Sequence, residues 1–243
     1  MNNKILINIF LITFSFCSFA DNEIFVDQTG SNALIDLEQV GSSNIIGGTD
    51  STAGNVSEAV LNGSTMTIDI NQIGSSNEFL TGGIYGDNFT GFFEFDGDSN
   101  IFDIDIDTDG TNGADFADFN VDITGSSNEF DLDFAETSGV NYLDLDWIID
   151  GDSNVFEFDV DYEYATNYID ILGDSNEITF SASGYGASSS DAGYFYLDLD
   201  GSSNTIDITQ SSTLARDWLK LETNASNSNI CIVQSDGGSA TSC

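Results

Sequence analysis

Carboxylates are the residues of this chain whose type and spacing could do chemistry. The sequence has 42 Asp and Glu residues against 3 Lys and Arg residues and no His, which gives a formal net charge of −39. Many of the acids alternate with apolar residues, as Asp103 and Asp105 do with Phe102 and Ile104. Carboxylate oxygens are ligands that Ca²⁺ prefers, so rows of these acids could bind calcium, or they could form a solvated acidic surface.

Most catalytic sites need groups that this chain lacks. Without His, and with so few bases, the common acid–base and nucleophilic arrangements are not available. A pair of carboxylates could cleave glycosidic bonds, but among 42 acids such pairs arise by chance. We therefore predict that the protein is not an enzyme, requires no cofactor and has no dedicated metal site. The acidic balance also argues against nucleic acid as a partner, because phosphates need Lys and Arg.

The alternation itself predicts the elements that position these acids. A period of two is typical of β-strands with one buried side and one solvent-facing side. The chain contains no Pro, which suits strands that are hydrogen-bonded to a neighbour on both sides. Only the segment Thr213–Leu221 could be interpreted as a short helix.

A tetrapeptide, Gly-(Ser/Asp)-Ser-Asn, separates the predicted strands. Its glycines are Gly41, Gly74, Gly97, Gly125, Gly151, Gly173 and Gly201, and its asparagines are Asn44, Asn77, Asn100, Asn128, Asn154, Asn176 and Asn204. A shortened copy, Gly30-Ser31-Asn32, precedes the first one. Stacked asparagines could hydrogen-bond along a ladder, or Asn and Gly could stand there only because they form turns well.

The spacing of the turns predicts the fold. The residue two positions after each turn asparagine is apolar, so the same register is kept through every turn. We expect an all-β chain, a β-solenoid of stacked strand–turn–strand rungs with about 22–28 residues per rung and about eight rungs. The alternative is an antiparallel β-sandwich, whose turns rarely repeat one tetrapeptide in one register.

The two ends of the chain predict its destination and a cross-link. Residues 1–20 resemble a secretory signal peptide, with Lys4, an apolar run and the small-x-small site Ser18-Phe19-Ala20. We therefore expect a secreted protein, extracellular or on the cell surface, with no membrane insertion after signal removal. Residues 21–229 would form the solenoid. Residues 230–243 would form a C-terminal segment in which Cys231 and Cys243 are joined by a disulfide, the alternative being two free thiols.

Three of the early turns carry a glutamine two residues before the glycine, namely Gln28, Gln39 and Gln72. This Gln-x-Gly-x-x-Asn pattern resembles the curlin repeat. The resemblance implies a secreted, stacked solenoid that polymerises with itself into extracellular amyloid-like fibres. By position, these glutamines with Asn44 and Asn77 match the inward ladders of that family. From Gly97 onward the glutamine position is apolar, so the resemblance is carried by the N-terminal turns.

Two functions follow as expectations. The first is a structural subunit of a curli-like fibre of the cross-β type, for a biofilm matrix or for adhesion, whose partner is a further copy of the chain. The second is a monomeric acidic β-solenoid at the cell surface that binds cations, a glycan or a partner protein.

Overall fold

The computed structural model describes residues 23–48, 57–86, 88–106, 117–134, 143–161, 165–184, 194–212 and 218–236. The predicted signal peptide and Cys243 lie outside these ranges. Within them every regular element is a strand, and neighbouring strands pair in parallel, which confirms the all-β solenoid. No helix long and apolar enough to cross a membrane occurs among the described residues.

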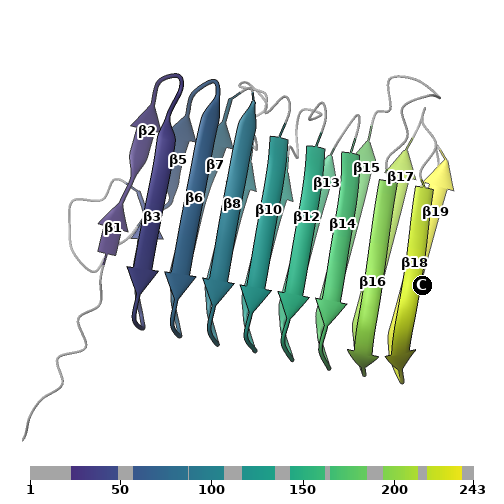
Figure 1. Cartoon of the computed structure of the whole chain (residues 1–243). Helices are drawn as coiled ribbons and strands as arrows, with labels where there is room; N and C mark the ends of the chain where they lie inside the picture. The colour runs from purple at the N-terminus through teal and green to yellow at the C-terminus, as the bar shows by residue number, and fades with distance from the viewer. Residues whose placement is uncertain are drawn as a thin grey trace, which may run out of the picture.

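Two parallel sheets face each other along the length of the molecule (Figure 1). Sheet A has the path β1 (Glu23–Phe25), β4 (Ile45–Gly47), β7 (Glu78–Tyr85), β9 (Ile101–Ile106), β11 (Glu129–Phe134), β13 (Val155–Asp161), β15 (Glu177–Gly184), β17 (Thr205–Ser212) and β19 (Asn229–Asp236), with β2 (Asp27–Thr29) and β5 (Ala59–Asn62) beside this path. Sheet B has the order β3 (Leu34–Val40), β6 (Met66–Ile73), β8 (Phe89–Asp96), β10 (Ala117–Thr124), β12 (Leu143–Asp150), β14 (Ala165–Leu172), β16 (Tyr194–Ser202) and β18 (Trp218–Ser226).

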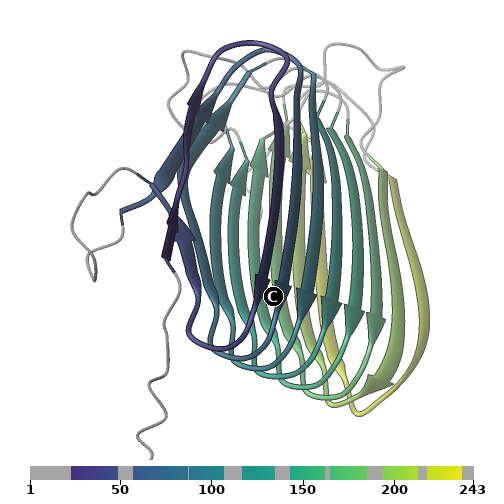
Figure 2. The same ribbon diagram turned by 60° about the vertical axis from the view of Figure 1, so that its left-hand side comes forward.

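Each rung runs from a sheet B strand through a turn into a sheet A strand, and these turns form one edge of the molecule (Figure 2). The turn has the tetrapeptide sequence in every described rung but the last. Equivalent turn positions in successive rungs are 33, 23, 28, 26, 22, 28 and 24 residues apart. All but the first fall within the predicted range. The longest rung exceeds it because its sheet A part is split into β4 and β5, with residues 49–56 between them.

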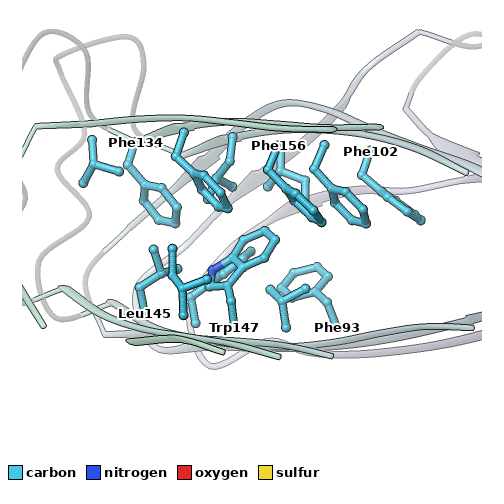
Figure 3. Close-up of a cluster of buried hydrophobic side chains, with 14 of the residues drawn as sticks. Phe93, Phe102, Phe134, Leu145, Trp147 and Phe156 are labelled. Atoms are coloured by element: carbon cyan, nitrogen blue, oxygen red, sulfur yellow. The ribbon is translucent and has the colours of Figure 1, made fainter. Parts of the chain in front are cut away.

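The core lies between the sheets and is rich in aromatic rings (Figure 3). Phe102, Phe130 and Phe156 occupy the same position in successive sheet A strands, with ring centroids 4.6 and 4.8 Å apart. From sheet B, Trp147 presents its ring edge-on to Phe158 at 4.6 Å. Such ring pairs contribute about 0.5–1.5 kcal/mol each beyond the area they bury. The alternating phenylalanines therefore stack at the spacing of the rungs and pack one sheet on the other.

The stack continues past the predicted boundary at residue 229. Strands β18 and β19 form a last rung that ends at Asp236. β18 includes residues 218–221 of the segment that could have been a helix, and residues 213–217 of that segment lie outside the described ranges. The turn between them has Ala225 and Ser228 where the earlier turns have Gly and Asn, so the tetrapeptide did not reveal it. Cys231 lies within β19 and is disulfide-bonded.

Candidate functional site

The turn asparagines form a continuous asparagine ladder along one edge of the solenoid. All seven are buried, with 0–1% of each side chain exposed. The backbone N–H of each asparagine before the last donates to the Oδ1 of the asparagine in the next rung, as from Asn100 to Asn128 at 2.8 Å and from Asn128 to Asn154 at 2.9 Å. In four turns the Nδ2 also donates to the glycine carbonyl of the preceding turn, as from Asn128 to Gly97 at 3.0 Å. These asparagine side chains thus hydrogen-bond each turn to the turn of the neighbouring rung.

Backbone conformation separates the two interpretations of these asparagines. Within the full turns, positive φ angles belong to the third-position serines, at 57–63°, and to six of the seven first-position glycines, at 134–154°, while the fourth-position asparagines have none. Asn is favoured over Ser where φ is positive, so a purely turn-forming Asn would stand at the third position. The asparagines therefore serve the ladder, and the serines bear the strained conformation.

The turn glycines let successive rungs approach each other closely. At Gly125, where φ is +134°, a Cβ atom would lie 2.0 Å from the carbonyl oxygen of Gly97. The same contact recurs along the column from Gly74 to Gly201. A residue without a side chain fits at these six positions without displacing the neighbouring carbonyl.

The predicted glutamines fall into two places. Gln39 and Gln72 are neighbours in sheet B, and the Nε2 of Gln72 donates to the Oε1 of Gln39 at 2.8 Å. Gln28 is not part of this ladder, because it lies in sheet A beside Leu61. The backbone N–H of its turn glycine, Gly30, donates to the carbonyl of Asn62, at the edge opposite the asparagine ladder. The eleven residues from Gly30 to Gly41 therefore span half a rung, which carries the chain from one edge to the other.

A second glutamine pair lies at the other end of the stack. Gln234 donates through Nε2 to the Oε1 of Gln210 at 2.8 Å. Gln210 is fully buried and takes the inward position that Ala182 has one rung earlier. The alternation after Asn204 places Gln210 inside, so this pair could have been found from the sequence. Inward glutamines thus stand at both ends of an otherwise largely apolar core.

The outward acids are aligned in rows, as the sequence predicted. Asp103, Asp131 and Glu157 are register neighbours in sheet A, and so are Asp105 and Asp133. Partial burial, followed by the charges of Asp103 and Asp133, raises the pKa of Asp105 to about 7. Within the described ranges no three Cys, Asp or Glu side chains converge to hold a metal ion, so Ca²⁺ binding stays a prediction.

The outer face of sheet B carries aromatic residues near its C-terminal end, which the sequence reasoning missed. The rings of Tyr168 and Tyr196 stack at 4.6 Å, and the Nζ of Lys220 lies 4.6 Å from the centre of the Tyr196 ring. Lys220 also forms an ion pair with Glu222 at 2.9 Å. In the next outward column, Tyr194 stacks on the exposed Trp218. This end of the sheet therefore combines an exposed apolar surface with a cation.

In comparisons with protein-family models, curated proteins and solved structures, the chain matched none of them. We therefore infer function from the geometry of the ladder, the acidic faces and the two ends of the stack.

Proposed function

We propose that the chain is a structural subunit of an extracellular cross-β fibre, formed when copies stack head to tail along the solenoid axis. The observation that carries the proposal is the state of the core at its two ends. Inward side chains in the middle rungs are almost completely buried, whereas Ile35 and Leu37 at one end, and Leu219 and Leu221 at the other, are only partly buried. Open strand edges above such a core favour pairing with a further chain.

The two edges of sheet B are complementary in register. Ala225 holds the place of the turn glycine, so a following copy that continues the column would put Gly41 next to it. Counting back from that turn sets β3 of the following copy on β18. The inward residues Ile35 and Leu37 then meet Leu219 and Leu221. On the outer face Leu34, 74% exposed, meets Trp218, 54% exposed. The junction would cover two of the most exposed apolar side chains on the described surface.

Charge supports the same register. Lys220, one of only three basic residues, would lie opposite Asp36 of the following copy. Within a subunit the sheet neighbour of Asp36 is Asp69, a like charge, so a cation on the open side of Asp36 would offset their repulsion. Elsewhere the outer faces are predominantly acidic, and like charges on neighbouring fibres repel. The charge pattern therefore favours linear growth over lateral aggregation.

A role in a biofilm matrix or in adhesion follows from the curlin resemblance and is part of the proposal. A fibre built in this way would present acidic rows and stacked turns along its whole length. The asparagine ladder would continue across each junction, because the ladder position of the last rung, Ser228, would be followed by Asn44.

Fibre formation and its register can be tested together. The mature protein should form fibres with a meridional reflection at about 4.7–4.8 Å. Asp36→Lys should slow elongation because it puts two cations at the junction, and the double variant Asp36→Lys/Lys220→Asp should restore it. Asp69→Lys, the same change one rung inside the subunit, is the matched control and should elongate normally. A protein that stays monomeric at high concentration and high salt would refute the fibre proposal.

The second candidate function is a monomeric surface protein that binds a cation, a glycan or a partner protein. It is favoured by a shallow groove on the outer face of sheet B, which is lined by the apolar residues Phe92 and Ile148 and by the acids Asp122 and Asp146. An apolar floor between carboxylates suits a cationic amphipathic ligand. Persistent monomers that bind a cationic peptide through this groove would favour this alternative over the fibre.

A further inference from the structure

We infer that β1 and β2 act as an internal plug, which occupies the place that β19 of the preceding copy takes in a fibre. The inference rests on the proposed function and concerns how assembly is regulated. The two sheets contain different numbers of tiers. The path of sheet A contains nine strands, with β2 and β5 continuing the tiers of β1 and β4, whereas sheet B contains eight. The described solenoid therefore consists of an odd number of half-rungs.

An odd number of half-rungs cannot stack without a conflict. If β3 of a following copy pairs with β18, the turn after β3 brings β4 and β5 of that copy onto β19. In the free subunit, however, β4 and β5 are already paired with β1 and β2. Figure 1 shows β1 and β2 at this end of the stack. In a fibre, the tier next to β4 and β5 could thus be occupied either by the subunit's own β1 and β2 or by the β19 strand of its neighbour.

The N-terminal segment and β19 present inward side chains of matching type. Ile24 and Ile230 belong to the column of Ile46, and Gln28 and Gln234 belong to the column of Leu61. Between them lie Val26 in the N-terminal segment and Ile232 in β19, both partly buried against the core. The inward side of the N-terminal segment therefore matches that of the strand that would replace it.

The plug is the weaker of the two. β1 and β2 pair through three residues each, and none of their side chains is fully buried. β19 is an uninterrupted strand of eight residues. Release of β1 and β2 would uncover Ile46 and Leu61, now 1% and 2% exposed, and β19 of the preceding copy would cover them again. In this exchange a short, interrupted strand is thus replaced by a longer one that covers the same two residues.

This arrangement makes detachment of β1 and β2 a step in every addition of a subunit. Free subunits would resist assembly while the plug is in place, which would suit a protein that has to leave the cell before it polymerises. The alternative junction keeps β1 and β2 and pairs them with β19 of the neighbour. That junction leaves a strand position empty between β18 and β3 and exposes the apolar edge residues there.

The test weakens the plug in the otherwise intact mature chain. The backbone N–H of Val26 donates to the carbonyl of Gly47 at 2.8 Å. Val26→Pro removes this donor, and Val26→Ala keeps it while losing similar side-chain contact. In seeded elongation followed by light scattering, Val26→Pro should elongate about five-fold faster than Val26→Ala, the factor expected for one backbone hydrogen bond.

A second pair of variants guards against a local folding defect. Ile24→Asp places a charge in an inward position, whereas Phe25→Asp places it on the outer side. Ile24→Asp should accelerate elongation and Phe25→Asp should not. Circular dichroism should show an unchanged strand content in all four variants.

The outcomes separate this inference from the proposed function. Equal rates for Val26→Pro and Val26→Ala would overturn the plug while leaving the fibre in place. Loss of elongation in Val26→Pro and Ile24→Asp, with the controls active, would also overturn it and would show that β1 and β2 themselves form the junction. Failure of the wild type and all variants to grow on seeds would overturn the fibre proposal and the plug with it.

Discussion

Replacement of Asn128 by alanine tests whether the asparagine ladder holds the rungs together. Asn128 is 1% exposed; its Oδ1 accepts the backbone N–H of Asn100 at 2.8 Å, and its Nδ2 donates to the carbonyl of Gly97 at 3.0 Å. Asn128→Ala leaves one buried donor and one buried acceptor without these partners. Each such loss costs about 1–3 kcal/mol, so we expect a destabilisation of about 2–6 kcal/mol. For a chain of this size the Tm should fall by roughly 4–24 °C.

Urea unfolding followed by the fluorescence of the buried Trp147 would measure this loss. Asn120→Ala is the matched control, because Asn120 lies on the outer face of sheet B and bonds to Asp118 next to it. The control should stay within about 0.5 kcal/mol of the wild type, as surface substitutions usually do. If Asn128→Ala is equally mild, the ladder contributes nothing to stability, and the asparagines are present only as turn formers.

Asn128→Asp refines the test through pH. The introduced carboxyl has the shape of the amide, but when ionised it turns an oxygen toward the Gly97 carbonyl, whereas the neutral acid can donate to it. Burial raises its folded-state pKa above the unfolded value of about 3.9. The folded state then binds more protons, so stability is lost as the pH rises from about 4 through the folded-state pKa. We expect Asn128→Asp to be more stable than Asn128→Ala at pH 3.5 and less stable at pH 8.

Four further substitutions probe other features of the structure. Ser127→Asn should stabilise by up to about 1 kcal/mol in urea unfolding, because Ser127 has a φ of 63° that Asn tolerates better; a loss of stability would contradict the strain. Gly125→Ala should destabilise by at least about 2 kcal/mol, because its Cβ would meet the Gly97 carbonyl at 2.0 Å, and an unchanged Tm would disprove the close stacking. Because the pKa of Asp105 is raised to about 7, the folded state holds its proton more tightly than the unfolded state, and the Tm of the wild type should fall as the pH rises from about 4 to 7. Asp105→Asn should flatten this slope of Tm against pH. Parallel slopes in the two proteins would exclude Asp105 as the cause. Asn167→Leu should raise the free energy of unfolding by about 1 kcal/mol or more, because the buried Asn167 amide has no hydrogen-bond partner among the described residues and lies between Leu145 and Phe195. A lower free energy of unfolding in this variant would mean that the amide is hydrogen-bonded.

The fold was predictable because its two signals agree. Alternation such as that of Phe102, Asp103 and Ile104 defines strands, and the repeated turn sets a common register, so stacking was the one arrangement that buries every apolar side. The last rung was missed because Ala225 and Ser228 replace the residues that mark a turn. The Ser228 hydroxyl still accepts the backbone N–H of Asn204, so the ladder reaches the last rung through a residue that the tetrapeptide pattern does not include.

The candidate site was only partly predictable. The sequence indicated a ladder but could not decide between ladder and turn propensity, because that decision depends on which turn residue carries the positive φ. Gln28 was grouped with Gln39 because both precede a glycine by two residues, and only the pairing shows that their turns lie on opposite edges. The meeting of Lys220 with the tyrosine pair joins residues from separate rungs, and no local pattern marks it.

The unequal edges of the solenoid make it a scaffold on which sequence can be added without loss of alignment. The tetrapeptide turn keeps one length, while the spacing between ladder positions ranges from 22 to 33 residues. Most of that variation is absorbed between a sheet A strand and the next sheet B strand, or within the tier of β4 and β5, and a register shift in β7 accounts for one further residue. A foreign peptide inserted between β9 and β10 would leave the asparagine edge intact. Equivalent insertions in successive rungs would be displayed in a row at intervals of about 4.8 Å, set by the strands that carry them.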